Sequence, residues 1–261
     1  MSCVWRCVMA ELVNVVMKLR AAGGGEVPML MKSYDVDAND VMKEWKEASK
    51  RTKDKSVPGD DRTPPWRWTL AMYSTRRDGA GKTVRELLAL PRQNLIAAMV
   101  NKGATFEYKQ KLSCKHLATT GMVWLGDPDA VMLVDGKEVD VGAMKVEAKK
   151  LEKQPFEEQY DVAKRLGHGC IALDVRGVGI GKGKDKTRHV RVRPRISRWS
   201  AEFQALIEPD LVDTLTELLR YCGSMAGLGD WRPAGPTPGV FGKFDADVEV
   251  VGGKGAASGK H

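Results

Sequence analysis

The stretch from Arg188 to Ile196, which reads RHVRVRPRI, constrains the fold of this chain more than any other. Basic and apolar residues alternate along it, which is the pattern of a strand whose successive side chains point to opposite faces of a sheet. Val190, Val192, Pro194 and Ile196 would then lie on a hydrophobic core. The opposite face would present His189 and a row of guanidinium groups. We therefore predict a half-buried β-strand with one basic face.

Positive charge is concentrated around this strand. The chain of 261 residues has a formal net charge of +8. Residues 176–198 contain nine Lys or Arg and one acid, Asp185, so their net charge equals that of the whole chain. A local basic excess favours an acidic partner, and nucleic acid is the simplest such partner.

Composition narrows the class of protein. An apolar fraction of 43% is enough for a hydrophobic core, and no apolar run approaches the ~20 residues of a membrane span. Residues 1–10 do not form a convincing signal peptide. The five cysteines are odd in number, and neither they nor the four histidines have the spacing of a zinc site. We expect a cytoplasmic protein with reduced thiols, no metal, no cofactor and no membrane association.

Periodicity predicts a mixture of strands and helices. Strands are expected where residues alternate or where β-branched and aromatic residues gather. These segments are Glu11–Arg20, Trp66–Ser74, Cys170–Val175, Ser200–Ile207 and Val240–Val251, with short strands joined at the Asp135-Gly136 turn between 123 and 141.

Helices are expected where apolar residues recur at helical spacing. One begins at Asn39 or Asp40, one at Pro91, and short helical segments lie within 113–121 and 147–165. The clearest helix is capped by Asp210, runs through Cys222, and would end at Gly223. This order of elements predicts an α+β fold in which helices cover one face of an antiparallel sheet.

Three motifs resemble nucleotide or metal sites. Gly79-Ala-Gly-Lys-Thr83 resembles a phosphate-binding loop, but Arg76 stands where the pattern needs glycine, which favours a polar turn. The run 177–184, GVGIGKGK, opens a basic strand rather than the helix that a dinucleotide fingerprint requires. We interpret it as a flexible basic hairpin tip.

Asp129 and Glu147, with Lys149, match the outline of a metal-dependent nuclease, in which two carboxylates hold Mg²⁺ and the lysine helps to orient a water molecule. The simpler interpretation is that Asp129 belongs to an ordinary turn and Glu147 to a solvated segment. A metal-dependent nuclease is kept as an alternative function.

Two segments after the basic strand carry a resemblance to a known family. They read Gly227-Leu-Gly-Asp-Trp-Arg and Gly239-Val-Phe-Gly-Lys-Phe, and they follow the helix capped by Asp210. This arrangement is similar to the C-terminal glycine-rich loop of the RAMP superfamily, the RRM-like proteins that include backbone subunits of CRISPR effector complexes. The segments 27–32 and 90–99 agree in order with the early segment after the first strand and with the first helix of that superfamily. The segment 193–199, with Phe203, the capped helix and the glycine-rich loop, also resembles uncharacterised tailed-phage proteins.

The resemblance implies a ferredoxin-like or RRM-like core, a basic groove for RNA or single-stranded nucleic acid, and head-to-tail assembly. The insertion at 233–238 departs from the family pattern, and no catalytic residue can be carried over. We expect a single RRM-like domain over 11–251 with inserted hairpins and helices, an inserted subdomain at about 104–168, and a flexible tail at 252–261.

The function expected from the sequence is non-enzymatic binding of single-stranded RNA or DNA, as a homo-oligomer and in a phage-encoded protein. The residues expected to bind are Lys182, Lys184, Lys186, Arg188, Arg191, Arg193, Arg195, Arg198, Trp231, Arg232 and Lys243. Trp231 is equally compatible with stacking on bases and with filling the edge of the sheet. A phage assembly protein that binds an acidic partner is a further alternative.

Overall fold

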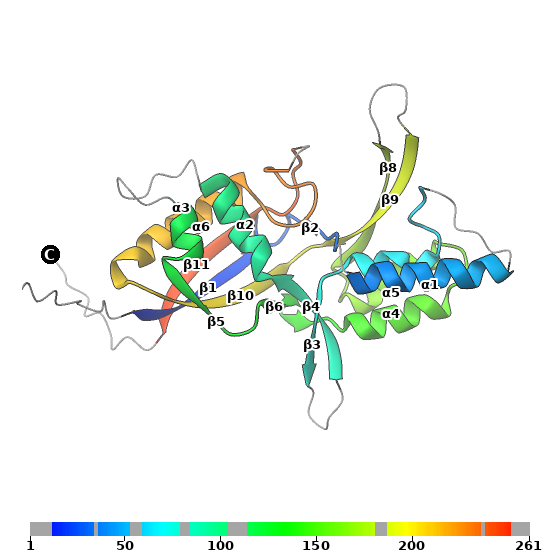
Figure 1. Ribbon diagram of the computed structural model, residues 1–261, viewed down its shortest axis with the longest axis horizontal. Coiled ribbons are helices and arrows are strands. Elements are labelled where there is room, and N and C mark those ends of the chain that lie inside the picture. The colour runs from blue at the N-terminus through cyan, green and yellow to red at the C-terminus, as the bar shows by residue number, and fades with distance from the viewer. Residues whose placement is uncertain are drawn as a thin grey trace, which may run out of the picture.

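The computed structural model describes residues 12–33, 36–52, 59–78, 84–103, 114–180, 187–235 and 238–251. These residues form two antiparallel sheets and two groups of helices (Figure 1). The fold is therefore mixed, with a large antiparallel sheet, and it confirms the α+β class expected from the order of elements.

The large sheet is built around β1 and β10, which lie side by side over almost their whole length. Val13 of β1 is opposite Ile207 of β10, and Arg20 is opposite Ser200. The strand order is β11-β1-β10-β6-β4-β3, with β5 also paired to β10 and β7 to β6. The strands are β1 (Val13–Ala21), β3 (Ser74–Asp78), β4 (Val84–Pro91), β5 (Met122–Leu125), β6 (Asp129–Val134), β7 (Lys137–Glu138), β10 (Trp199–Ile207) and β11 (Phe244–Val251).

One face of this sheet is covered by α2 (Arg92–Gly103), α3 (Cys114–Thr119) and α6 (Val212–Met225) (Figure 1). The apolar stripe of α6 includes Leu215, Leu218 and Leu219, each fully buried. The opposite face of the sheet carries charged side chains, such as Lys18 bonded to Glu249 at 2.6 Å. Alternation along β1 and β10 thus separates an apolar face from a polar one.

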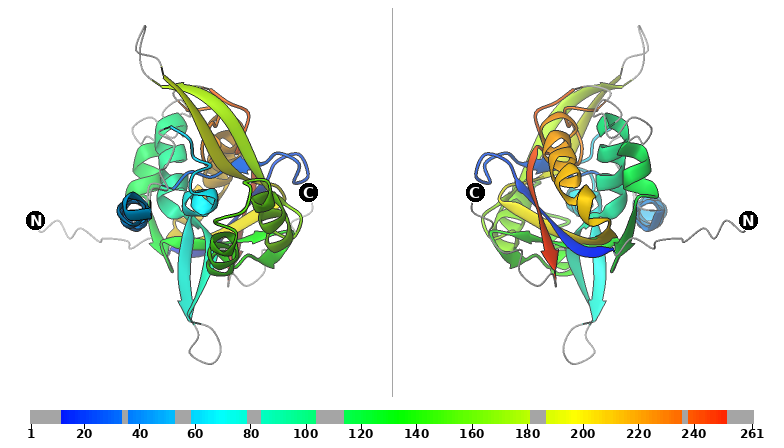
Figure 2. Two further views of the ribbon diagram at one scale, coloured as in Figure 1. Left: turned by 90° about the vertical axis from the view of Figure 1, so that its right-hand side faces the viewer. Right: turned by 90° about the vertical axis from the view of Figure 1, so that its left-hand side faces the viewer.

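The second sheet has the order β2-β9-β8 and contains the predicted basic strand. Its strands are β2 (Met29–Leu30), β8 (Ile171–Ile180) and β9 (Thr187–Ile196). β8 packs against α5 (Glu158–Leu166), and β9 packs against the 3₁₀ helix η1 (Pro65–Ala71). The long β8–β9 hairpin projects from the body of the molecule, and α1 (Val36–Thr52) and α4 (Val141–Lys150) lie beside its base (Figures 1 and 2).

The residues expected to form an inserted subdomain contribute to both parts of the molecule. Within the described portion of this segment, β5 and β6 are strands of the large sheet, whereas α4 and α5 belong to the second helical group. Asp135 and Gly136 have φ angles of 52° and 73°, so they make the expected left-handed turn between β6 and β7. The expected tail, 252–261, lies outside the described residues.

Three local predictions were wrong. Asp210 is not the N-cap of α6: it lies in the 3₁₀ turn η3 (Pro209–Leu211), and the capping position is Leu211, which makes no side-chain capping bond. The segment Trp66–Ser74 has strand composition, but residues 65–71 form η1, which buries both Trp66 and Trp68. Burial of two indole rings on one short helix outweighs β-propensity, which is a weak preference. Gly223 does not end α6, which continues to Met225 and is followed by Gly227 with a φ of 65°.

Gly223 instead allows α6 to approach β11 closely. A Cβ atom at this position would overlap the carbonyl oxygen of Phe244 on β11. Since a carbonyl oxygen in a paired strand cannot move aside without shifting the strand, only glycine fits here.

No helix in the described part of the chain is long and apolar enough to span a membrane. Among the same residues, Cys170 and Cys222 are buried and form no disulfide bond. Cys3 and Cys7 lie outside the described residues.

We predict that Gly223→Ala lowers the free energy of unfolding by about 1–3 kcal/mol, the range for overpacking a close contact. Alanine ordinarily favours a helix interior by about 1 kcal/mol over glycine, so the clash with Phe244 has to outweigh that gain. Urea denaturation would measure the change, with the neighbouring exposed position changed in Ser224→Ala as the control. Unchanged or increased stability of Gly223→Ala would contradict the proposed close contact.

Candidate functional site

The β8–β9 hairpin gathers charged side chains on one face. Asp174 is opposite Arg193 in the register, and Arg176 is opposite Arg191. Directly opposed residues point to the same face of a sheet, so these two pairs bring three arginines and one carboxylate together on one face. The expected alternation along β9 is thereby confirmed for Val192, Pro194 and Ile196, which are buried.

Arg193 is the most deeply buried arginine of this face, with only 8% of its surface exposed. Its guanidinium group donates a hydrogen bond of 2.9 Å to Asp230 and lies 3.5 Å from Asp174. Asp174 also accepts a hydrogen bond of 2.8 Å from Arg176. The buried Nε atom of Arg193 has no partner in the described residues. This arginine therefore joins the hairpin to the segment after α6, residues 227–235 and 238–242, which we call the glycine-rich segment.

The glycine-rich segment is held against β2 by backbone hydrogen bonds. The Asp230 N–H donates to the Leu30 carbonyl at 2.8 Å, and the Gly242 N–H donates to the Pro28 carbonyl at 2.9 Å. Gly229 has a φ of 78°, and a Cβ atom there would overlap the Leu30 carbonyl oxygen. Glycine is thus required at 229 both for the left-handed turn and for the close approach that positions Asp230.

Trp231 lies over the charged face of the hairpin. The Arg176 guanidinium lies 4.5 Å from the centre of its ring, and the Phe241 ring lies 5.9 Å away. Arg176 also lies 5.4 Å from the centre of the Phe241 ring. Since cation–π contacts hold a guanidinium plane against an aromatic face, the two rings orient Arg176. Trp231 therefore supports the site from inside the fold as well as lining it.

These elements enclose a groove of about 620 Å³. Its walls come from β8, β9 and the glycine-rich segment, with Lys32 between them. The charged residues and the tryptophan that line it are Lys32, Arg176, Arg191, Arg193, Asp230, Trp231 and Arg232. Five of these side chains are cations and one is a carboxylate, so the groove is strongly basic.

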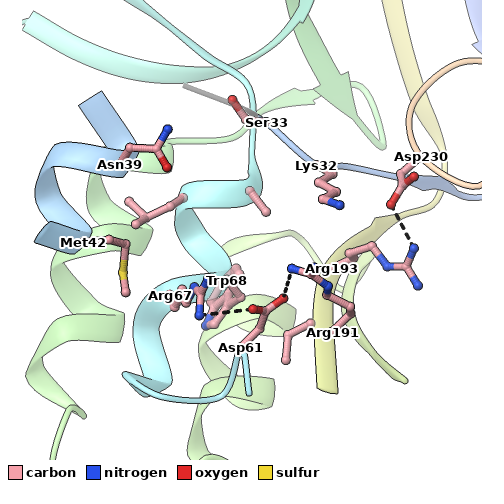
Figure 3. Close-up of a pocket in the computed structure, with 13 residues that line it drawn as sticks. Lys32, Ser33, Asn39, Met42, Asp61, Arg67, Trp68, Arg191, Arg193 and Asp230 are labelled. Atoms are coloured by element: carbon pink, nitrogen blue, oxygen red, sulfur yellow. Dashed lines mark hydrogen bonds and ion pairs between the residues drawn. The ribbon is translucent and has the colours of Figure 1, made fainter. Parts of the chain in front are cut away.

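A smaller cavity of about 170 Å³ adjoins the groove. The two share Lys32, Arg191, Arg193 and Asp230 as lining residues. Figure 3 shows the cavity between these residues on one side and α1 with η1 on the other. The Asp61 carboxylate lies in its wall, within 3.1 Å of Arg67 and 3.4 Å of Arg191.

Opposing effects set the ionisation of Asp230. Burial raises the pKa of this carboxyl group. The hydrogen bond from Arg193 and its charge lower the pKa, as do the hydrogen bond from the backbone N–H of Trp231 and the charge of Lys32. The net effect holds the pKa of Asp230 below its ordinary value, so its bond to Arg193 is an ion pair at neutral pH.

The structure brings together four of the residues expected to bind nucleic acid. Arg191, Arg193, Trp231 and Arg232 all line the groove. The other expected residues within the described segments lie elsewhere: Arg188 lines a separate hollow beside residues 177–179, and Arg195, Arg198 and Lys243 line neither the groove nor the smaller cavity. Lys182, Lys184 and Lys186 lie outside the described residues.

Acidic side chains compensate part of the arginine row. Arg191 is paired with Asp61, Arg193 with Asp174 and Asp230, and Arg198 with Asp135 at 3.4 Å. These acids lie outside the basic strand in the sequence, so the composition of the strand could not identify them. β9 has four arginines. Among the described residues, Arg191 and Arg193 have ion-pair partners, whereas the exposed Arg188 and Arg195 have none.

Several residues of the site were not identified from the sequence. Lys32 and Arg67 lie in segments without a charge pattern, and Arg176 lies in a strand recognised only by its apolar residues. The alternation Asp174-Val175-Arg176 could have indicated a second strand with charged side chains on one face, paired with the basic strand.

The residues of the nuclease alternative lie in different settings. Asp129 begins β6, where burial and the neighbouring charge of Asp127 raise its pKa. Glu147 lies on α4 and accepts a hydrogen bond of 2.6 Å from Lys150, which lowers its pKa. Across the described segments, no group of three or more His, Cys, Asp or Glu side chains is placed to hold a metal ion.

No protein-family model matches the sequence, and a search of curated proteins finds no match.

We predict that Arg193→Met lowers the free energy of unfolding by about 3–5 kcal/mol, because it leaves Asp230 without its cation and removes one of the two arginines at buried Asp174. The matched substitution Arg188→Met, on the same strand but exposed, should change stability by less than about 0.5 kcal/mol. Urea denaturation of both variants tests this. Equal stabilities would mean that Arg193 does not hold the site together.

We predict that the stabilising contribution of Asp230 disappears in acid. Since its pKa is lowered by folding, the contribution is complete above the unfolded pKa of about 4 and is lost as the pH falls through the folded value. The stability difference between the native protein and Asp230→Asn should therefore be large at about pH 7 and small at about pH 3. Asp245→Asn, at an exposed position on β11, is the control and should show little difference at either pH.

Proposed function

We propose that this protein binds single-stranded nucleic acid in the groove between the β8–β9 hairpin and the glycine-rich segment. The observation that carries the proposal is the convergence of five cationic side chains and Trp231 on one groove of about 620 Å³. Sequence-distant segments supply these cations, so their convergence is a property of the fold. Phosphate groups are the ligands that best complement several arginines on one surface.

A single strand suits this groove better than a duplex does. Arg176 presents a planar guanidinium group held by two aromatic rings, and such planes stack on unpaired bases. Bases inside a duplex are stacked on one another and cannot make this contact. The groove therefore combines phosphate binding with a stacking platform.

The polar face of the large sheet is a poorer candidate. The described residues that β1, β10 and β11 point to this face include no aromatic side chain, and they carry more acids than bases. They are Asn14, Val16, Lys18, Arg20, Ser200, Glu202, Gln204, Leu206, Asp245, Asp247, Glu249 and Val251. Base stacking on this face is therefore not part of the proposal.

We infer that the core of the large sheet is ferredoxin-like. Support comes from the order β11-β1-β10-β6, from antiparallel pairing throughout, and from α2 and α6, which connect these strands on one face. The glycine-rich segment lies between α6 and β11, where the RAMP superfamily has its glycine-rich loop. Membership of that superfamily remains a hypothesis supported by this arrangement.

Head-to-tail assembly is a second part of the proposal. The basic groove and the more acidic sheet face are complementary in charge, which would favour contact between the unlike surfaces of two copies. Sedimentation before and after nuclease treatment would test whether copies associate and whether nucleic acid is needed.

We predict that the protein binds a labelled single-stranded oligonucleotide at about 50 mM salt, and that affinity falls steeply by about 200 mM as counterions are released. The double variant Arg191→Met/Arg232→Met should bind at least about tenfold more weakly, with a salt slope smaller in magnitude by about 1–1.5. It should fold normally, because it leaves Arg193 in place.

The charge-matched control is Arg20→Met/Arg220→Met, which removes two exposed cations that pair with Asp247 outside the groove. Failure of the native protein to bind RNA or DNA at low salt would refute the proposal. Equal losses in the two double variants would show that binding follows net charge rather than this groove.

A further inference from the structure

The smaller cavity has a wall that the groove lacks. Asn39 and Met42 of α1, with Arg67 and Trp68 of η1, line it on the side away from the glycine-rich segment (Figure 3). Trp68 is 1% exposed and donates a hydrogen bond of 2.9 Å to Gln159, so this wall is part of the core. The cavity is therefore a side chamber of the groove and is bounded by packed structure at its far side.

Cations converge on this chamber from three segments. Lys32 follows β2, Arg67 lies on η1, and Arg191 and Arg193 come from β9. Two carboxylates, Asp61 and Asp230, also line it, and Asp174 lies behind Arg193, so the cations outnumber the acids by one. Asp61 lies between Arg67 and Arg191, at 3.1 and 3.4 Å, and so orders both guanidinium groups beside the space. A small space lined by ordered cations is suited to a compact anion.

On its edge away from β8, β9 makes backbone hydrogen bonds at Val190 and Pro194, on either side of Val192. The Val190 N–H donates to Gly59 and its carbonyl accepts from Asp61, whereas the Pro194 carbonyl accepts from Met31. Alternate residues of a strand direct their backbone groups to the same edge, so Val192 directs its N–H toward the chamber that it lines. A backbone donor there complements the side-chain cations.

We infer that this chamber binds a phosphomonoester. A terminal phosphate carries about −1.5 to −2 charges at neutral pH and three strong acceptor oxygens, which complement the four lining cations and their several donors. An internal phosphodiester carries a single charge and has chain on both sides. The wall formed by α1 and η1 closes one side of the chamber, so the chamber suits the end of a molecule better than a chain that continues through it.

Two sources of this group are compatible with the chamber. One is the terminal phosphate of a strand lying in the adjoining groove, and this version rests on the proposed function. The other is a small phosphorylated molecule such as a nucleoside monophosphate, which does not require the groove to bind nucleic acid. The chemistry recognised is the same in both cases.

The test compares one single-stranded oligonucleotide sequence, as RNA and as DNA, with a 5′ phosphate, a 3′ phosphate or neither. One terminal phosphate should tighten binding by about tenfold, since charge-assisted hydrogen bonds to an ordered site are among the strong ones. The small-molecule source is tested by titrating the protein with adenosine monophosphate and with inorganic phosphate and measuring binding by calorimetry.

Arg67→Met is the diagnostic variant, because Arg67 lines the chamber and not the groove. It should abolish the gain from the terminal phosphate while changing affinity for the unphosphorylated strand by less than about twofold. Arg62→Met is the matched control, since Arg62 is close in sequence but pairs with Asp60 outside the chamber. Thermal unfolding checks that each variant is folded. If Arg67→Met unfolds, Lys32→Met replaces it; because Lys32 lines both spaces, the readout is then the ratio of affinities for the phosphorylated and unphosphorylated strands, which should fall to about one.

The outcomes separate this inference from the proposed function. Strand binding without any effect of a terminal phosphate, together with no binding of either small phosphate, overturns the inference and leaves the proposed function intact. Binding of a small phosphate that Arg67→Met abolishes, without strand binding, supports the inference and refutes the proposed function. A terminal-phosphate gain that survives in both Arg67→Met and Lys32→Met also overturns the inference.

Discussion

The ion pairs of Arg193 join the β8–β9 hairpin to the glycine-rich segment, and the contact of Arg176 with the rings of Trp231 and Phe241 supports them. The Arg193 guanidinium group lies between Asp174 on the hairpin and Asp230 on the glycine-rich segment. Desolvation of these charges costs free energy, and their mutual attraction offsets that cost only when the geometry is retained. The relative position of the hairpin and the segment, and with it the shape of the groove, therefore depends on this arginine.

The arginines of the site consequently have different physical roles. Arg193 is buried and committed to two carboxylates, so it contributes position and local potential more than direct contact. Arg191 and Arg176 each share a carboxylate and remain partly exposed, which leaves donors available to a ligand. A basic face of this kind is ordered before any ligand arrives, which lowers the entropic cost of binding.

The groove and the smaller chamber share one wall, formed by Lys32, Arg191, Arg193 and Asp230. A ligand in one space therefore changes the electrostatic environment of the other. The groove is open along the hairpin, whereas the chamber is bounded by α1 and η1 (Figure 3). Extended and terminal parts of one polyanion would accordingly find different surroundings within a short distance.

The sequence by itself determined the features that depend on neighbouring residues. Alternation determined the basic strand β9, helical spacing determined α6, and a left-handed dipeptide determined the turn at Asp135-Gly136. The grouping of Arg191 and Arg193 with Trp231 and Arg232 was also expected, because a basic strand and a glycine-rich segment were both visible.

Only the tertiary structure decided which arginines are neutralised and which line a cavity. Arg193 and Asp230 are 37 residues apart, and no local pattern links them. The 3₁₀ helix at 65–71 and the close contact at Gly223 likewise follow from burial against distant segments. Local patterns fix the direction of a side chain along its own strand or helix, whereas its partner is fixed by packing between elements, which sequence spacing does not encode.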